Sequence, residues 1–187
     1  MPYHLITPDE VRSLLDSDPP HTGKLATARA DGRPHLAPVW FVLEPDGSVL
    51  VTTSEDSVKG RNLRHAGRAA LCVDEEAPPY AFVLMEGRVD LIDDLAELRA
   101  VAGRIGARYM GADAAEEIPA RNGVPGGLLV RLHPDRVTGA ADRPDEWEIC
   151  VQAPGLARQL DGETVYPVCF RDASELRSVD AEPEAGS

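Results

Sequence analysis

The sequence predicts a mainly β fold, in which six strands form a small closed barrel with helices around it. Short stretches of alternating apolar and polar residues, separated by turn signals, succeed one another from residue 24 to residue 92. A long amphipathic helix is expected between the last two strands. A doubly wound sheet would need a helix between most consecutive strands, so this order of elements favours a barrel.

The first expected element is a short helix over residues 8–15. Thr7 suits its N-cap, a proline occupies the first helical position, and Glu10 completes a capping box with Thr7. After Gly23 the apolar pattern takes the period of strands, and Gly- and Pro-containing turns separate the first three. The six strands are predicted at residues 24–29, 35–43, 49–53, 69–73, 80–92 and 127–137.

The later elements carry two further signals. Gly87, inside the longest predicted strand, indicates a bulge or a bend of the barrel. The long helix begins at residue 93 or 94, and a further helix is expected over residues 113–121. The apolar stripe of the long helix consists of Leu95, Leu98, Val101, Ile105 and Tyr109.

Two domains are expected, a barrel over residues 1–140 and an acidic extension over residues 141–187. The extension holds eleven acidic residues against four arginines, so it contributes −7 to a net charge of −13. Residues 147–151 and 164–170 could pair as a hairpin, and residues 178–187 have a composition typical of disorder. No chemistry is assigned to this extension.

Composition favours a soluble cytoplasmic protein without a structural metal. Apolar stretches are too short to cross a bilayer, and no charged-then-apolar signal pattern opens the chain. The three cysteines, Cys72, Cys150 and Cys169, form no C-x-x-C pair, which suits a reducing compartment. Five scattered histidines lack metal-ligand spacing. A pI near 4.7 argues against binding of nucleic acid or of an anionic membrane.

A cationic island interrupts this acidic chain directly after the predicted strand 49–53. One of only two lysines, Lys59, is followed by Arg61, Arg64 and Arg68, and no acidic residue lies between Asp56 and Arg68. A strand that ends in hydroxyl residues and leads into a basic helix brings free N–H groups, the helix dipole and cationic side chains together. The pattern predicts a site for a phosphorylated small molecule.

Structural explanations compete with each of these functional ones. The basic residues could form a solvated helix face, and the hydroxyl residues at the strand end could serve only as strand end and N-cap. Trp40 could be a core or dimer contact. Pro38 removes a main-chain donor and therefore indicates a strand edge or a bulge, which a ligand-facing edge would explain.

Several short motifs occur in one order along the chain: Gly23-Lys24-Leu25-Ala26-Thr27, Asp31-Gly32-Arg33-Pro34-His35, Ala37-Pro38-Val39-Trp40-Phe41 and Lys59-Gly60-Arg61-Asn62-Leu63. Ala69 to Asp74 and Glu86-Gly87 follow downstream. With these motifs, roughly residues 5–140 resemble the pyridoxamine-phosphate-oxidase-like split β-barrel superfamily, an FMN-binding-protein-like fold. More narrowly, they resemble its branch that uses the deazaflavin coenzyme F(420).

The resemblance implies a homodimer with two cofactors at the subunit interface. It implies that the cofactor phosphate lies against the strand end and helix at Thr52, Thr53, Ser54, Lys59, Arg61, Asn62 and Leu63. Arg61 or Arg64 could also pair with the oligoglutamate tail of F(420). The tricyclic ring would lie along Ala37, Pro38, Val39 and Trp40, oriented by main-chain groups.

No residue pattern indicates a protein nucleophile or general base, which fits an enzyme whose cofactor carries the chemistry. The leading hypothesis is an F(420)-dependent oxidoreductase that transfers a hydride between the reduced deazaflavin and a conjugated organic substrate. The alternatives are an FMN-dependent oxidase or reductase, and a non-enzymatic protein that binds a cofactor, haem or nothing. Tyr80 and Tyr109 are weak candidates for the proton donor, although both could equally belong to the core.

Overall fold

The computed structural model describes residues 3–115, 117–142, 158–160 and 163–165. Contacts divide the chain into a unit of residues Tyr3–Asp142 and a second unit of the remaining residues. In the second unit, β9 (Arg158–Leu160), which the sequence did not predict, pairs with β10 (Glu163–Val165). The strand predicted at residues 147–151 and the segment 178–187 lie outside the described residues.

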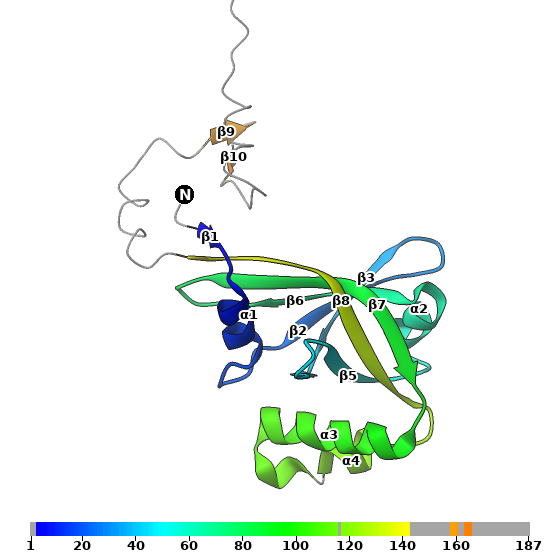
Figure 1. The fold of residues 1–187 in the computed structure, drawn as a ribbon. Helices are drawn as coiled ribbons and strands as arrows, with labels where there is room; N and C mark the ends of the chain where they lie inside the picture. The colour runs from blue at the N-terminus through cyan, green and yellow to red at the C-terminus, as the bar shows by residue number, and fades with distance from the viewer. Residues whose placement is uncertain (1–2, 116, 143–157, 161–162, 166–187) are drawn as a thin grey trace, which may run out of the picture. The chain divides into compact units, whose positions relative to one another are not determined.

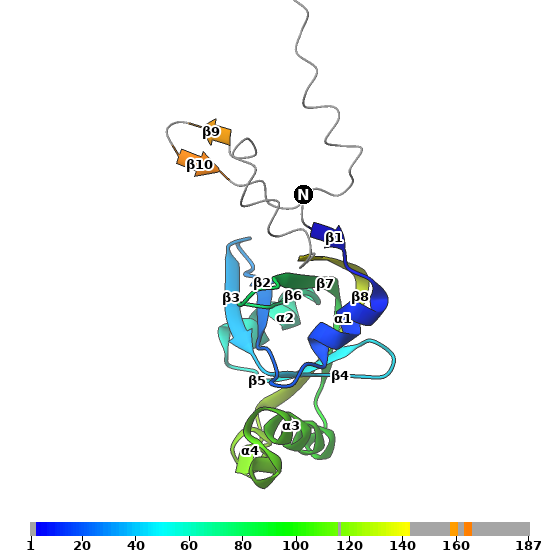
Figure 2. The same ribbon diagram turned by 90° about the vertical axis from the view of Figure 1, so that its left-hand side faces the viewer.

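The first unit is built on a curled antiparallel sheet, which confirms the prediction of a mainly β barrel fold (Figures 1 and 2). The strands follow the order β3-β2-β6-β7-β8-β5-β4, and β1 pairs with β8. Their bounds are β1 Tyr3–Leu5, β2 Gly23–Ala28, β3 Pro34–Val39, β4 Phe41–Leu43, β5 Val49–Ser54, β6 Arg68–Asp74, β7 Ala81–Ile92 and β8 Gly127–Asp142.

The strand predicted over residues 35–43 is wrong in one respect, because it breaks at Trp40. Its first half, β3, pairs with β2 at one end of the sheet, and its second half, β4, pairs with β5 at the other end. One chain segment therefore forms both edges of the sheet, and its continuity from β3 to β4 closes the sheet into a barrel (Figure 2). Alternation of apolar residues cannot reveal such a change of partner.

Two further findings concern β8. It extends to Asp142, five residues beyond the predicted end, because its last residues pair with both β1 and the start of β7. The irregularity expected at Gly87 is confirmed: the register between β7 and β8 shifts between Glu86 and Gly87, and the extra residue is Asp135 of β8. A Cβ on Gly87 would collide with the main chain of His133, so the close approach requires glycine.

Two of the helices, α1 and α3, begin close to where the sequence predicts. In α1 (Pro8–Leu15) the Glu10 amide donates to the Thr7 hydroxyl (3.3 Å) and the Thr7 amide donates to the Glu10 carboxylate (2.8 Å). These bonds from Thr7, with a smaller contribution from His4, lower the pKa of Glu10 to about 2. The island forms α2 (Val58–Ala66), and α3 (Leu95–Met110) has Asp94 as its N-cap.

The helix predicted over residues 113–121 is instead a 3-10 turn, Ala112–Ala115, followed by α4 (Glu117–Asn122). This pair packs against α3 on one side of the sheet (Figure 1). Among the described helices, none is long and apolar enough to cross a membrane.

The apolar core occupies the inside of the curled sheet. Phe41, Leu71 and Val83 are fully buried there, and Leu15 of α1 and Leu63 of α2 belong to the same cluster. Burial of one such side chain stabilises the fold by roughly 1.5–3 kcal/mol. The opposite face of β4, β5 and β8 packs on α3 through a second cluster: Val42, Leu50, Leu129, Leu98, Val101 and Ile105.

Candidate functional site

The junction between β5 and α2 is held by its hydroxyl residues. Ser57, rather than Ser54, is the N-cap of α2, and its Oγ accepts a hydrogen bond from the Gly60 amide at 2.9 Å. Thr53 Oγ1 lies 3.0 Å from Ser57 Oγ, and Ser57 Oγ also lies 2.8 Å from the Ser54 carbonyl oxygen. The expectation that residues 52–54 supply the N-cap is therefore wrong by one turn.

Gly60 allows α2 to approach the end of β5. A Cβ at this position would overlap the carbonyl oxygen of Ser54 and crowd the main chain of Glu55. The first turn of α2 contains no acidic residue. Its exposed N–H groups and the helix dipole are therefore not neutralised by a side chain of that turn.

The cations of the island differ in their contacts. Arg61 donates to the Asp56 carbonyl oxygen, Arg64 pairs with Glu55 at 3.3 Å, and Arg68 pairs with Asp135 at 2.8 Å. Lys59, half-buried in the first turn of α2, has no hydrogen bond or ion pair within the described part of the chain. Lys59 is thus the cation of this helix that remains available to an outside anion.

Two predicted site residues of α2 face the core. Leu63 is 1% exposed, and Asn62 is 6% exposed and donates from Nδ2 to the Thr27 hydroxyl of β2 at 2.9 Å. Their side chains fix α2 against the sheet. A ligand outside the barrel would meet neither of them.

The predicted ring-binding strand, β3, is an edge strand, as Pro38 indicated. Pro38 is exposed opposite Lys24, whereas Val39 is 7% exposed and packs into the core. Ala37 lies opposite the buried Leu25 and is half-buried. A ligand along this edge would therefore meet mainly the main chain of residues 37–39.

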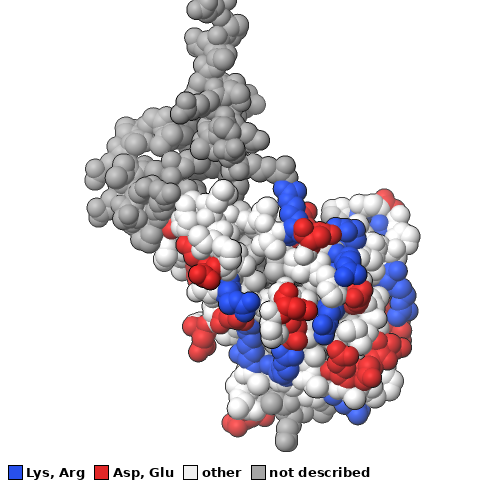
Figure 3. All heavy atoms as spheres, viewed as in Figure 1, with Lys and Arg blue, Asp and Glu red and all other residues white. Residues whose placement is uncertain are grey.

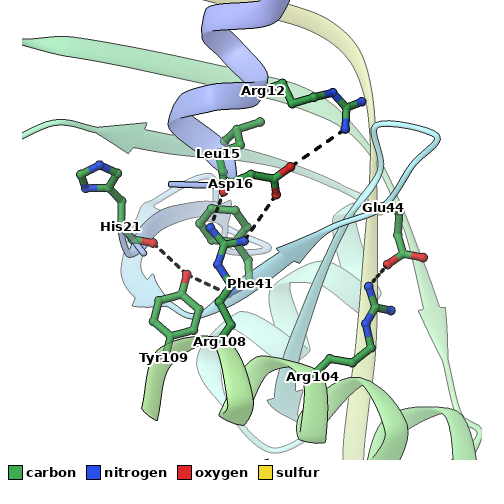
Figure 4. Close-up of polar contacts among 9 residues, drawn as sticks. All are labelled: Arg12, Leu15, Asp16, His21, Phe41, Glu44, Arg104, Arg108 and Tyr109. Carbon is green, nitrogen blue, oxygen red and sulfur yellow. Dashed lines mark hydrogen bonds and ion pairs between the residues drawn. The ribbon is translucent and has the colours of Figure 1, made fainter. Parts of the chain in front are cut away.

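Trp40 was a candidate for ring binding and Tyr109 for proton donation. In the structure they form a stacked pair with ring centroids 5.0 Å apart and an interplanar angle of 7°. The Tyr109 hydroxyl donates to the His21 carbonyl oxygen (2.8 Å) and accepts from the Phe41 amide (3.3 Å), as Figure 4 shows. Burial raises the pKa of Tyr109. The hydroxyl is engaged on both sides, so it anchors the ring rather than offering a proton.

Sequence reasoning missed Arg108, which completes this cluster. Its guanidinium lies 4.9 Å from the centre of the Phe41 ring and 5.6 Å from that of Tyr109, and it donates to the Leu15 carbonyl oxygen (Figure 4). An arginine beside an apolar helix stripe gives no signal of its own. Only the packing of α3 against the end of α1 and the start of β4 reveals its role.

The strand register brings most of the predicted site together. Phe41 pairs with Val51, so Trp40 lies at the position across from Thr52, where the hydroxyl-rich end of β5 begins. Helix α2 contacts both β3 and β5. We call this region, formed by residues 37–40, residues 52–54 and Lys59, the α2 corner.

Tyr80 lies elsewhere within the chain. It precedes β7. Its carbonyl oxygen accepts from the Asp142 amide at 2.7 Å, and its amide donates to the Asp142 carboxylate at 3.0 Å. Thr52 is level with Leu129, which pairs with Ile92 at the other end of β7. The twelve residues of β7 thus separate Tyr80 from Thr52, whereas Pro38 of β3 is in register, across β2 and β6, with Leu84, four residues from Tyr80.

Charge on the face shown in Figure 3 is mixed, with basic side chains close to acidic ones. Ion pairs such as Arg104–Glu44 (2.5 Å) and Arg136–Glu86 (3.8 Å) join neighbouring elements. Within the described residues, no group of three or more His, Cys, Asp or Glu side chains could hold a metal ion.

A family model and several solved structures match this chain. The sequence model of the pyridoxamine 5'-phosphate oxidase family matches residues 7–140. A conserved hypothetical protein from Mycobacterium tuberculosis is similar in structure, with a TM-score of 0.64 and 22% identity over 84% of this chain and 95% of that one.

Two other similar structures have named functions. An F(420) reductase has a TM-score of 0.54 and 23% identity over 67% of this chain and 94% of its own. HutZ, the haem storage protein from Vibrio cholerae, has a TM-score of 0.56 and 21% identity over 70% of this chain and 92% of its own. At these identities the likeness shows a shared fold.

Proposed function

The chain belongs to the pyridoxamine 5'-phosphate oxidase family, and on this premise we propose that it binds a flavin or deazaflavin cofactor at the α2 corner. The observation that carries the proposal is the contrast between Lys59, which has no partner among the described residues, and Arg61, Arg64 and Arg68, which are engaged. Lys59 would bind the cofactor phosphate together with the N–H groups of the first turn of α2.

Coenzyme F(420) is the cofactor we propose, in the reduction of a conjugated organic substrate. When bound and reduced, it supplies a hydride. The chain would hold the phosphate at Lys59, orient the ring along the edge of β3 and keep water away. Pro38 lacks an N–H and can offer only its carbonyl oxygen, so any main-chain N–H to the ring would come from a neighbouring position. An F(420) reductase shares the fold, which supports this choice.

The glutamate tail of F(420) would distinguish it from FMN. Arg64 pairs with Glu55 on the surface, with both side chains about half exposed (59% and 42%). Surface pairs of this kind contribute about 0–1 kcal/mol, so a tail carboxylate could replace Glu55 at small cost. Arg61 is bound only to a main-chain oxygen and could turn to the tail as well.

Two alternatives are an FMN-dependent enzyme and a non-enzymatic carrier. An FMN-dependent oxidase or reductase would use Lys59 in the same way but would not need Arg61 and Arg64. A non-enzymatic carrier is favoured by the shared fold of HutZ, a haem storage protein.

Parallel fluorescence titrations of the purified protein with F(420) and with FMN test the proposal. We expect tight binding of F(420) and weak binding of FMN. The reverse preference would move the protein to the FMN alternative, and a protein that binds neither would contradict the proposed enzyme function. Replacement of Arg61 and Arg64 together by alanine should weaken binding of F(420) more than binding of FMN.

We also propose a homodimer that forms through the outer face of the sheet near β3. Leu36, Ala26 and Ala70 lie side by side across β3, β2 and β6. One row further, Pro38, Cys72 and Leu84 lie in line with Lys24, which stands between Pro38 and Cys72 and pairs with Asp74. Leu36 is 65% exposed. A largely apolar sheet face that ends at the ligand-binding edge would place the cofactor beside the second subunit.

The Leu36→Glu variant should be monomeric at concentrations at which the wild type is dimeric. Each dimer would lose two buried leucines, about 1.5–3 kcal/mol each, which corresponds to roughly a 100-fold or greater rise in the dissociation constant. Light scattering after size exclusion measures this. Val124→Glu, at an exposed apolar residue (42%) away from this face, is the control. A dimer unchanged by Leu36→Glu would place the interface elsewhere.

A further inference from the structure

Trp40 stands at a break between two strand pairings. The last pair of β3 and β2 joins Val39 to Gly23, and the first pair of β4 and β5 joins Phe41 to Val51. Trp40 belongs to neither ladder. The buried main-chain groups next to this break therefore need partners other than a neighbouring strand.

The Tyr109 hydroxyl of α3 supplies such a partner on both sides of the break. It accepts from the Phe41 amide at 3.3 Å and donates to the carbonyl oxygen of His21, which precedes β2, at 2.8 Å (Figure 4). Phe41 is fully buried, so water cannot replace this partner of its amide. Burial raises the pKa of Tyr109, which keeps the hydroxyl protonated and able to donate at neutral pH. One side chain of α3 thus links the β2 side of the break to the β4 side.

Contacts on the Tyr109 ring fix the direction of its hydroxyl. Trp40 stacks on the ring with centroids 5.0 Å apart, and the Arg108 guanidinium lies 5.6 Å from the ring centre. Arg108 donates in turn to the carbonyl oxygen of Leu15 and lies 3.9 Å from the Asp16 carboxylate, both at the end of α1. The ring cannot turn away from the break without losing these contacts.

The break directly follows the edge along which the cofactor ring is proposed to lie. Pro38 and Val39 are the last two residues of β3, which stands at one end of the sheet and pairs with β2. Main-chain groups that bind a ligand are most effective when they are in place before it arrives, because ordering them on binding costs affinity. Past the last pair with β2, the contacts of Tyr109 are what hold this end of the edge.

We propose that Tyr109 is a positioning residue of the cofactor site: its hydroxyl ties the segment before β2 to the start of β4 and thereby holds the ring-binding edge of β3 ready for the cofactor. The inference rests on the proposed function, because it takes the cofactor ring to lie along this edge. It gives Tyr109 neither a proton transfer nor a contact with the cofactor. Lys59, by contrast, would contact the cofactor phosphate itself.

Tyr109→Phe in the full-length protein tests this, since it removes the hydroxyl and keeps the stacked ring. The probes are F(420) and its ring-and-ribityl fragment, which lacks the phosphate and the glutamate tail. Fluorescence titration should show both bound about 3- to 12-fold more weakly than by the wild type, the equivalent of one neutral hydrogen bond. The ratio of the two affinities should not change, because the contacts at α2 are intact.

Lys59→Ala and Ile105→Val are the matched variants. Lys59→Ala should weaken binding of F(420) and leave binding of the fragment unchanged, so that the ratio falls. Ile105→Val shortens a buried side chain of the same helix, in the cluster that packs on the other face of β4. It should lower the melting temperature and leave both affinities within about 1.5-fold of the wild type, because it touches no contact at the break.

Hydrogen exchange of the Phe41 amide, followed by NMR on the cofactor-free protein, gives a reading that needs no cofactor. Protection of this amide should fall at least about tenfold further in Tyr109→Phe than in Ile105→Val. Equal protection in the two variants, an unchanged affinity for the fragment, or a weakening confined to F(420) would each overturn the inference. A wild type that binds neither probe would overturn the proposed function and with it the cofactor role of Tyr109, whereas the Phe41 amide would still report whether the hydroxyl holds the break.

Discussion

Replacement of Lys59 by alanine is expected to weaken cofactor binding by roughly 10- to 150-fold. A hydrogen bond between a charged donor and a phosphate is worth about 1.5–3 kcal/mol, which is that range of affinity. Lys59 stands in the first turn of α2, has no partner among the described residues and can meet an anion without breaking an existing contact. Fluorescence titration with F(420), and with FMN, measures the loss.

A control for this variant must remove one positive charge without touching the α2 corner. Arg33→Ala does so, because Arg33 is exposed and pairs with Asp31 of the turn before β3 at 2.7 Å. Cofactor affinity should remain within about twofold of the wild type, since one distant charge is largely screened at physiological ionic strength. Equal affinity of Lys59→Ala and the wild type would contradict an anion site at α2.

Replacement of Gly60 by alanine should destabilise the protein by about 1–3 kcal/mol, the usual cost of an extra carbon in a packed site. In an ordinary helix interior the same change would stabilise it by about 1 kcal/mol. At Gly60 the added Cβ meets main-chain oxygens of residues 54 and 55, which cannot turn away as a side chain could. Urea unfolding, with the slope held common to both proteins, measures the difference.

Gly60→Ala should also weaken cofactor binding, because the clash moves the first turn of α2 away from the end of β5. Lys59→Ala is its natural comparison, since it should change affinity and leave the free energy of unfolding nearly unaltered. Stabilisation of Gly60→Ala by about 1 kcal/mol would mean that α2 and β5 are not in close contact. The positioning of the corner would then need another explanation.

Much of the fold follows from local sequence patterns. The capping box at Thr7, the apolar stripe after residues 93 and 94 and the strand periods of β5, β6 and β7 predicted these elements to within one or two residues at their starts. A cap depends on residues within one turn, and a strand period depends on which side chains avoid water. Both are therefore readable from the chain alone.

The candidate site was predictable only in part. The charge pattern identified the basic island that contains Lys59, and Pro38 indicated a strand edge. The sequence could not distinguish Lys59 from Arg64, which Glu55 neutralises, or show that Asn62 turns inward to Thr27. All these residues look alike as polar positions on a short helix, and their roles depend on which neighbour the fold supplies.

The sequence by itself thus determined the type and order of the main elements and the place where positive charge gathers. Only the tertiary structure decided that one segment breaks at Trp40 to form both edges of the sheet, and that Trp40 then stacks on Tyr109. Local patterns record whether a residue is buried or capped. Strand partners and ring contacts join residues far apart in the chain, and closure of the barrel selects them.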